Sequence, residues 1–378
     1  MSSSKRTTAW AATMHGHSAG ELSEAHADTH VRIKPNELYD RRAREAFEAE
    51  WLVPGATQAN GAGNRTIPEE PDETRTCFER DRDRILHGTT AFRRLAGKTQ
   101  VFVFPEDHQR TRLTHALEVT QVATSVARAI RLNVALTEAI ALGHDCGHGP
   151  GGHASEDAFS QYLDGGYDHA VWGADVVLQP LNLCAETLDG IRNHSWSRPA
   201  PSTPEGEVVS WADRIAYVCH DFEDAVHVGI VKPSELPPLV RQVCGETRRE
   251  QLHTFIAALS NTAIATGRIG MDAQTAEALA EFRRFNYENI YMRPESVLQG
   301  NQVIAVLQAL VEYYAADPTR LPADQQPNEL TPNHAESFRA AVTYVGGMTD
   351  RYAFGHAVDL LDWDPRNLPT GVDVRGLT

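Results

Sequence analysis

The sequence predicts an all-α protein, and three observations support this fold class. Apolar residues return every three to four positions over residues 79–310, and again over residues 335–361. Few runs alternate apolar and polar residues as strands do, and no internal repeat is visible. Hydrophobic residues make up 41% of the 378 positions, so the chain can bury a substantial core. We expect one α-helical domain with additional helices over residues 36–378.

The segments outside these helices have the composition of loops. Residues 1–35 are rich in Ser, Ala and His, and they predict a mobile, disordered N-terminal tail. Its histidines lack the spacing of an ordered metal site: His15, His17, His26 and His30. Gly, Pro, Asn and acidic residues mark two further loops, at residues 53–74 and 317–332, and the ending from Trp363 also reads as irregular.

Hydropathy and cysteine usage predict a cytoplasmic protein. No apolar run approaches the roughly 20 residues that cross a bilayer, and residues 1–30 lack the apolar stretch of a secretory signal. The cysteines are odd in number and form no Cys-x-x-Cys pair, so we expect reduced thiols. They are Cys77, Cys146, Cys184, Cys219 and Cys244.

The charge distribution favours a small anionic ligand over nucleic acid. A net charge of −16 opposes nonspecific binding to a polyanion. Between Glu79 and Arg112, however, eight basic residues outnumber five acidic ones. Ion pairs along a solvated helix account for part of this cluster, as in the string ERDRDR. The remaining basic residues suit a small anion.

A helix over residues 111–131 would turn His115 inward. At about 100° per residue, His115 shares a face with the apolar residues of this segment. That face comprises His115, Val119, Val122, Val126 and Ile130, and the other face comprises Glu118, Gln121, Thr124, Ser125 and Arg128. A single inward histidine is usually a hydrogen-bonded core residue, so His115 alone does not indicate a ligand.

The string GHDCGHGPGGHASED, which follows a short apolar helix at residues 135–142, indicates a metal site. Adjacent His144 and Asp145 offer an imidazole and a carboxylate to a divalent cation. The glycines allow tight folding that brings His148 and His153 to the same neighbourhood. Either His153 or Ser155 opens the next helix, with Glu156 in its first turn. Three His, three acidic residues and five Gly in fifteen positions are hard to explain as a polar surface loop.

The string VVSWADRIAYVCHDFEDAV predicts a third helix with two faces. Its apolar stripe comprises Trp211, Ile215, Ala216, Cys219 and Phe222. Asp213, Tyr217 and Asp221 follow one another at intervals of four residues on the opposite side. Alone, such a face is more typical of a solvated acidic surface. Beside the His-rich string, Asp213 becomes a candidate fourth metal ligand.

The order His115, His144–Asp145, Asp213 resembles the HD phosphohydrolase superfamily, in which an H…HD…D pattern holds one divalent metal. The strings RLAGKTQVF, HQRTRLTHALEVTQVA, GHDCGH, DGIRNHSW and MTDRYA make the chain similar to bacterial dGTP triphosphohydrolases and related dNTPases. This resemblance extends from about Tyr39 to Ala353. It implies an HD core at about residues 75–230 and a helical C-terminal part at about residues 235–365.

The resemblance also implies a role for individual residues. One divalent metal ion would be bound by His115, His144, Asp145 and Asp213. His153 and Glu156 match the catalytic pair, in which Glu156 would hold the tautomer of His153 while His153 protonates the 5′-oxygen. Substrate positions are matched by Arg112 on the triphosphate, His148 and His169 on the phosphate side, Tyr217 and Asp221 on the deoxyribose and its 3′-hydroxyl, and Gln100 near the sugar edge.

One departure from the family concerns the loop after the HD pair. Where relatives read HPPFGH or HGPFSH, this chain reads HGPGGH, with Gly151 in place of an aromatic residue. Glycine has no side chain to pack and samples more backbone conformations. The change bears on how rigidly His153 is held and how tightly the base pocket closes. It removes none of the expected ligands.

The expected reaction is attack on the α-phosphorus of a dNTP, giving a deoxynucleoside and tripolyphosphate. The resemblance supplies this site of attack, since the residues alone also allow β or γ cleavage. The ligand set suits Mn, Fe, Co, Ni or Zn, and Mg less well. Tyr217 and Asp221 would leave little space for a 2′-hydroxyl, so deoxyribonucleotides are expected.

Other interpretations remain at this stage. The chain is alternatively another HD phosphohydrolase, such as a 5′-deoxynucleotidase, or a nucleotide-sensing or nucleic-acid-binding protein with an inactive site. A helical scaffold would leave the His-rich string unexplained. The family resemblance also implies a homo-oligomer, a hexamer or tetramer, with dNTPs as candidate allosteric ligands.

Overall fold

A computed structural model describes residues 4–101, 110–326 and 330–370. Parts of four predicted segments lie outside these ranges: residues 1–3 of the N-terminal tail, residues 102–109 of the string after Gln100, residues 327–329 of the second loop, and the last eight residues of the irregular ending. Internal contacts divide the chain into two units, residues 1–39 and residues 40–378.

Residues 1–39 contain short elements that the sequence analysis did not predict. Helix α1 (Lys5–Ala12) begins after Ser4, whose side chain caps its N-terminus, and none of its residues is buried. Strands β1 (His17–Ala19) and β2 (Leu22–Glu24) pair in antiparallel orientation. The mobility of this segment in solution stays a prediction.

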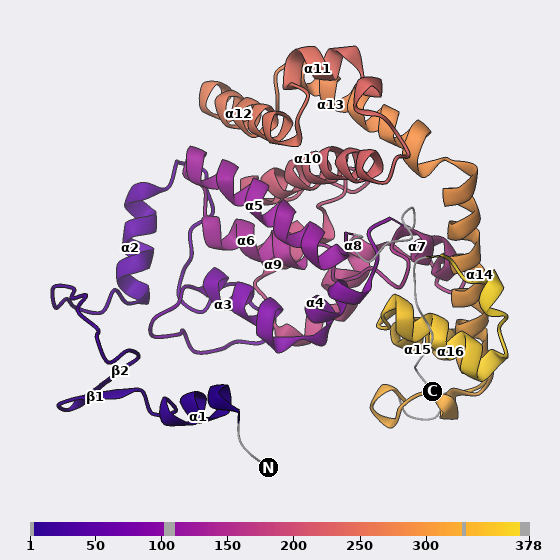
Figure 1. The fold of residues 1–378 in the computed structure, drawn as a ribbon, viewed down its shortest axis with the longest axis horizontal. Coiled ribbons are helices and arrows are strands. Elements are labelled where there is room, and N and C mark those ends of the chain that lie inside the picture. Colours follow the sequence, from indigo (N-terminus) through magenta and orange to yellow (C-terminus); the bar gives the residue numbers. More distant parts are fainter. Residues whose placement is uncertain (1–3, 102–109, 327–329, 371–378) are drawn as a thin grey trace. The chain divides into compact units, whose positions relative to one another are not determined.

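The described part of residues 40–378 is helical, which confirms the predicted fold class. Figure 1 shows α3, α5, α6, α9 and α10 at the centre of this unit, α11 to α13 beside them, and α14 to α16 at the end of the chain. Short 3₁₀ and π turns join several helices. The α-helices are α2 (Arg41–Trp51), α3 (Cys77–Asp83), α4 (Thr90–Arg94), α5 (Arg112–Ile130), α6 (Val134–Gly143), α7 (His153–Ser160), α8 (His169–Trp172), α9 (Ala185–Arg192), α10 (Pro204–His227), α11 (Pro238–Cys244), α12 (Arg248–Thr266), α13 (Ala273–Asn286), α14 (Pro294–Ala316), α15 (Ala335–Gly346) and α16 (Asp350–Leu361).

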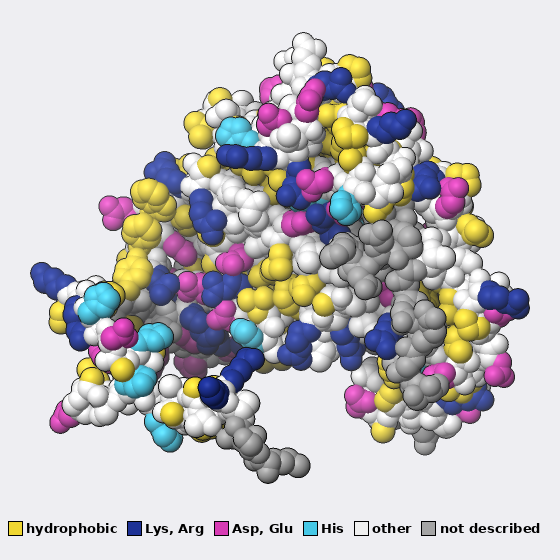
Figure 2. All heavy atoms as spheres, in the orientation of Figure 1, with side chains coloured by type: hydrophobic (Ala, Val, Ile, Leu, Met, Phe, Trp, Pro, Cys, Tyr) yellow, Lys and Arg dark blue, Asp and Glu magenta, His cyan; other side chains and the backbone are white. Residues whose placement is uncertain are grey.

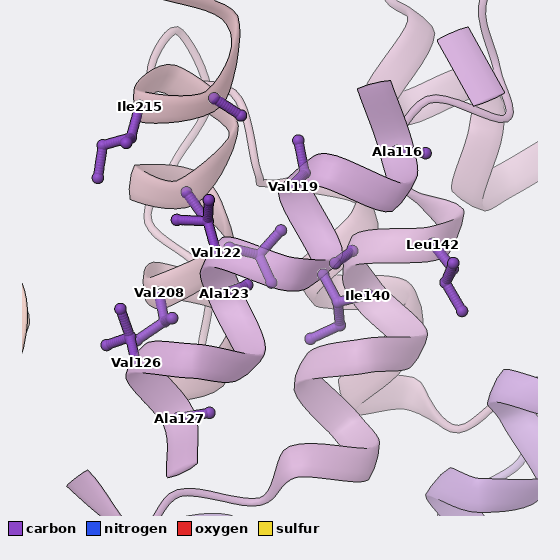
Figure 3. Close-up of a cluster of buried hydrophobic side chains, with 14 of the residues drawn as sticks. Ala116, Val119, Val122, Ala123, Val126, Ala127, Ile140, Leu142, Val208 and Ile215 are labelled. Atoms are coloured by element: carbon purple, nitrogen blue, oxygen red, sulfur yellow. The ribbon is translucent and has the colours of Figure 1, made fainter. Parts of the chain in front are cut away.

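The first hydrophobic core lies around α5, α6 and α10. Figure 3 shows buried apolar side chains of these three helices in one cluster, among them Val122 of α5, Ile140 of α6 and Ile215 of α10. The predicted inward face of α5, which includes His115, is buried as expected. Thr124 was wrongly assigned to the outer face, and it is 4% exposed. Its hydroxyl donates to the backbone carbonyl four residues earlier, so a polar side chain is satisfied inside the core.

The second hydrophobic core lies between α7, α8 and the C-terminal helices α14 to α16. The sequence predicted one helical stretch over residues 335–361, and this prediction is wrong in its continuity. Helix α15 ends at Gly346, a short turn follows, and α16 begins after Thr349. Two consecutive glycines weaken the helix, and the Thr349 side chain accepts the backbone N–H of Tyr352 as an N-cap.

The surface of this unit carries both signs of charge. On the face shown in Figure 2, basic and acidic side chains are interspersed, unlike the continuous basic surface that nonspecific nucleic-acid binding needs. Among the described residues, none of the helices combines the length and the apolar character required to cross a membrane.

Candidate active site

The three predicted motifs converge at one place. His115 lies one turn into α5, His144 and Asp145 follow the last residue of α6, and Asp213 lies near the middle of α10. Nε2 of His115 is 3.0 Å from Oδ1 of Asp213. Nε2 of His144 is 3.4 Å from Oδ1 of Asp145 and 3.7 Å from Oδ1 of Asp213. Two histidines and two aspartates therefore share one cluster.

His144 is oriented as metal-binding histidines are. Its Nδ1 atom donates to the carbonyl oxygen of Ala141 at 2.7 Å, which leaves the lone pair on Nε2. Nε2 is buried and forms no hydrogen bond within the described residues. A buried nitrogen without a partner is costly, and coordination to a cation would remove that cost. Two sets of three residues each bring their ligand atoms within 4.8 Å of one another: His115, His144 and Asp145, and His144, His194 and Asp213.

The electrostatics of the cluster favour ionised carboxylates. Burial would raise the pKa of Asp145, but its neighbours His144 and Arg112 hold that pKa well below its usual range. Burial likewise opposes ionisation of Asp213, and the hydrogen bond with His115 lowers its pKa overall. Burial would lower the pKa of His115, yet the hydrogen bond to Asp213 raises it. Two ionised carboxylates beside two imidazoles fit a divalent cation.

Arg112 lies between this cluster and His153. Its guanidinium is buried, and Nη1 donates to Oδ2 of Asp145 at 2.8 Å. Nη2 lies 3.4 Å from Nδ1 of His153, while Nε forms no hydrogen bond within the described residues. A Cβ atom at Gly152, whose φ is +62°, would overlap the guanidinium, so the loop can approach Arg112 only as glycine. A buried cation with a free donor is suited to a phosphate group.

A second group of histidines lies beside the cluster. The rings of His148 and His169 are stacked, with centroids 3.7 Å apart, and Nε2 of His148 is 3.2 Å from Oδ1 of Asp145. His194 was not among the predicted residues, although it lies in the DGIRNHSW string. Its Nε2 atom is 3.2 Å from Nε2 of His169, and burial lowers its pKa to about 3. His194 is therefore a neutral imidazole at the edge of the cluster.

Glu156, which was expected to hold His153, is paired with His169 in the structure. Oε1 of Glu156 forms a short contact with Nδ1 of His169 and also accepts the backbone N–H of His169 at 3.0 Å. Nδ1 of His153 faces Arg112 instead. His153 and Glu156 share the first turn of α7, but the start of α8 offers Glu156 two donors from one residue. The sequence could not show where α8 would lie.

A pocket of about 680 Å³ opens onto these residues. His144 and Glu156 contact residues of its wall. The predicted site residues that line the pocket are Gln100, Arg112, His115, Asp145, His148, His153, His169, Asp213, Tyr217 and Asp221. The structure thus brings all twelve predicted site residues, counted with His144 and Glu156, to one region.

The face of α10 that carries Tyr217 and Asp221 is a wall of this pocket. Asp221 is 4% exposed, and its Oδ2 atom accepts the Tyr291 hydroxyl at 2.5 Å. The Tyr217 hydroxyl accepts a hydrogen bond from Nε of Arg283 at 2.8 Å. Burial raises the pKa of Asp221 to about 6, although Tyr291 opposes the shift. The solvated acidic surface that this face suggests in isolation is absent here, because α13 and the turn after it cover the face.

Comparisons with known proteins agree with this geometry. Residues 112–218 match the HD domain family, and residues 269–357 match the phosphohydrolase-associated domain. A deoxyguanosinetriphosphate triphosphohydrolase-like protein of Caldanaerobacter subterraneus subsp. tengcongensis is 39% identical over 83% of this chain and 93% of its own length. Proteins of the same name from Clostridium perfringens and Desulfatibacillum aliphaticivorans are 39% and 37% identical, over 82% and 83% of this chain and 93% and 95% of their own lengths. The chain belongs to the deoxyguanosinetriphosphate triphosphohydrolase-like family of HD-domain proteins.

Membership of this dGTPase-like family confirms the predicted resemblance at the level of an HD phosphohydrolase. The HD match begins at Arg112 and includes His115, His144, Asp145 and Asp213. A buried His/Asp cluster within an HD domain indicates a divalent-metal site.

The glycine-rich loop of this dGTPase-like chain is tied down where an aromatic residue was expected. Gly151 has a φ of +72°, a conformation that favours glycine. Its backbone N–H donates to Oδ1 of Asp350 at 2.8 Å. The sequence left the rigidity of His153 open, and the structure shows a buried tether two residues before it. Asp350 belongs to the MTDRYA string but was not a predicted site residue.

Proposed function

We propose that the chain hydrolyses deoxynucleoside triphosphates, dGTP or several dNTPs, to a deoxynucleoside and tripolyphosphate. The observation that carries the proposal is the buried convergence of His115, His144, Asp145 and Asp213 beside Arg112, at a pocket of about 680 Å³. Attack at the α-phosphorus is inferred from the family, whose relatives are named triphosphohydrolase-like. The four cluster residues would hold one divalent ion.

A bound ion of this kind would polarise a phosphoryl oxygen and lower the pKa of a coordinated water. The imidazole and carboxylate donors favour Mn, Fe, Co, Ni or Zn over Mg. The free Nε2 atom of His144 and the low pKa values of the two aspartates support this assignment.

Arg112 is proposed to bind the triphosphate. Its Nε has no hydrogen bond among the described residues, and the guanidinium faces both Asp145 and His153. Charge-assisted bonds from a buried guanidinium would spread the phosphate charge. His148 and His169, stacked beside Asp145, are proposed to lie on the phosphate side.

His153 is proposed to protonate the leaving 5′-oxygen. His153 is exposed at the pocket wall, and the neighbouring charge of Arg112 lowers the pKa of its ring, which favours the neutral form in the free site. A triphosphate brings negative charge beside the ring and raises that pKa, which lets His153 take up a proton and deliver it. Glu156 acts indirectly, because it holds the ring of His169 and not that of His153. The centroids of the His169 and His153 rings are 5.8 Å apart.

Tyr217 and Asp221 are proposed to bind the deoxyribose, with Gln100 near the sugar edge. Asp221 can accept the 3′-hydroxyl while it keeps its hydrogen bond with Tyr291. The Tyr217 ring is fixed by Arg283 and would lie beneath the sugar. Little space is then left for a 2′-hydroxyl, so GTP should react much more slowly than dGTP.

The proposal is tested by incubating metal-loaded protein separately with each dNTP and with GTP, and resolving the products by ion-exchange chromatography. Tripolyphosphate and deoxynucleoside, absent with His115→Ala and Asp213→Ala, are the expected result. Orthophosphate released from a dNMP would favour a 5′-deoxynucleotidase instead. Tight dNTP binding without turnover under any of the metals would favour a nucleotide sensor and refute the proposed hydrolysis.

We also propose that the chain acts in the cytoplasm as a homo-oligomer, a hexamer or tetramer, with dNTPs as allosteric ligands. This part rests on the family resemblance alone. Light scattering with and without dNTPs tests it, and a monomer under both conditions would refute it.

A further inference from the structure

Asp350 is a buried carboxylate that joins three distant segments. It is the first residue of α16 and is 3% exposed. Oδ2 accepts the backbone N–H and the hydroxyl of Thr99, both at 2.7 Å, and Oδ1 accepts the backbone N–H of Gly151 at 2.8 Å. These partners are 251 and 199 residues away in the chain. One side chain therefore ties the C-terminal helices to two segments that border the pocket.

Lys98 forms a second tether to the same loop. Lys98 is only 3% exposed. Its ammonium group donates to the carbonyl oxygen of His148, and it also donates to the carbonyl oxygen of Gly346 at 2.9 Å. Gly346 is the last residue of α15, so this tether also begins at the C-terminal helices. Lys98 and Thr99 are adjacent in sequence, and they hold the α15–α16 turn and the glycine-rich loop together.

The tethers act on residues that have the proposed catalytic roles. Gly151 and Gly152 have φ values of +72° and +62°, and His153 follows them as the first residue of α7. On the other side, the backbone N–H of Arg112 donates to the carbonyl of Lys98 at 3.0 Å. Without an anchor, two consecutive glycines would sample many conformations. Both His153 and Arg112 thus depend on a backbone that the tethers fix.

We propose that Asp350 is a positioning residue, which holds the glycine-rich loop through Gly151 so that His153 faces Arg112 and the pocket. The inference deepens the proposed function and rests on it for the role of His153. Asp350 does not line the pocket, and it acts through the loop backbone. Residues that orient catalytic groups without touching the substrate commonly contribute about 10- to 100-fold to activity.

Glu205 provides a matched control. It is also buried, and it also binds two backbone N–H groups and one threonine hydroxyl, those of Thr57 and Asn133. It lies in the first turn of α10, and it is not among the residues of the pocket. Replacing either carboxylate by its amide exchanges one of two acceptor oxygens for an NH2 donor and removes the charge, so both variants disturb a similar set of hydrogen bonds, but only Asp350 reaches the glycine-rich loop.

The kinetic test compares Asp350→Asn and Glu205→Gln in the full-length, metal-loaded protein. For Asp350→Asn we expect kcat to fall roughly 10- to 100-fold, with KM changed less than about threefold, because a misplaced catalytic group mainly affects the transition state. Glu205→Gln should keep the wild-type kcat per folded, metal-loaded chain, even where its Tm falls. Equal kcat losses in the two variants, or none in Asp350→Asn, would overturn the proposal.

Hydrogen–deuterium exchange tests the positioning without any turnover. In Asp350→Asn, peptides covering residues 147–153 should exchange roughly tenfold faster than in wild type, since a neutral amide with a single acceptor oxygen replaces a carboxylate that accepts from both Thr99 and Gly151, and the weakened loop opens locally. Peptides of α5 and α10 should stay unchanged, and Glu205→Gln should leave the loop at the wild-type rate. An unaltered loop in Asp350→Asn would overturn the proposal, whether or not dNTPs are hydrolysed.

A wild-type protein that turns over no dNTP would refute the proposed function, while the exchange result would still decide the positioning role. If Asp350→Asn does not fold, Lys98→Met replaces it, because methionine keeps the apolar stem and removes only the second tether. The same acceleration at residues 147–153 is then expected. Its absence in a folded Lys98→Met chain would count against a tethered loop.

Discussion

Asp213 and His115 are 98 residues apart in the chain, yet Oδ1 of the one lies 3.0 Å from Nε2 of the other. The same Oδ1 atom is 3.7 Å from Nε2 of His144. One carboxylate oxygen therefore faces two imidazoles from two different helical segments. This arrangement exists only when α5, the end of α6 and α10 are packed together, so the metal site depends on the first hydrophobic core.

Removing the Asp213 carboxylate should empty this site. In Asp213→Ala we expect the metal content after dialysis to fall at least tenfold and dNTP hydrolysis to fall more than roughly 100-fold, since a direct ligand matters at least as much as its orienting partners. Elemental analysis by mass spectrometry measures the metal content, and chromatography of the products measures dNTP hydrolysis. Glu223→Ala is the control, because Glu223 lies on the same helix and forms an exposed ion pair with Arg248. Full metal content in Asp213→Ala would contradict the assignment.

Replacing Arg112 by lysine should lower the catalytic efficiency with dNTPs. Lysine keeps the charge but loses the planar, forked donors that contact both Asp145 and His153. We expect kcat/KM for dNTPs to fall roughly 10- to 100-fold, measured under initial-rate conditions. Arg110→Lys is a matched control two residues earlier, since Arg110 pairs with Glu118 and Asp224. Equal losses in the two variants would mean that Arg112 has no special contact with substrate.

The sequence predicted the site well where its residues belong to one helix face or one loop. The periodicity of α5 placed His115 among buried valines, and the glycine-rich string placed His144, Asp145 and His153 within one short segment. Such local relationships follow from helix geometry and chain length alone. The convergence with Asp213 needed the order of motifs as well, because no local rule brings α10 to α5.

The sequence could not show contacts that depend on how distant helices pack. Tyr291 and Arg283 cover the Asp221 and Tyr217 face from 70 and 66 residues away, and this burial turns an acidic surface into a pocket wall. Asp350 reaches Gly151 across 199 residues. Glu156 bonds His169 where His153 was expected, because the position of α8 is set by packing.

Neutralising Asp221 should change how stability depends on pH. Burial raises its pKa to about 6 in the folded protein, above the unfolded value, so the folded state binds its proton more tightly. The free-energy cost of ionising this buried carboxyl group in the folded protein is absent below about pH 4 and grows as the pH rises toward and through 6. Asp221→Asn should therefore raise the free energy of unfolding at pH 8 by up to roughly 3 kcal/mol, and at pH 4.5 by only about a third of that. Calorimetry at both pH values tests this, and an equal gain at both would refute it.

Breaking the buried ion pair between Arg65 and Asp81 should destabilise the fold without altering the chemistry. Nη1 of Arg65 is 2.6 Å from Oδ1 of Asp81, and the two side chains are 1% and 0% exposed. Asp81 also accepts the backbone N–H of Cys184 and the hydroxyl of Thr187. Asp81→Ala leaves the guanidinium buried without its partner, so the free energy of unfolding in urea should fall by about 3–5 kcal/mol. Adding Arg65→Met should recover part of that loss, since the uncompensated charge is then gone. Neither residue lines the pocket, so kcat per folded chain should stay at the wild-type value, and a double variant no more stable than Asp81→Ala would show that charge burial is not the cause.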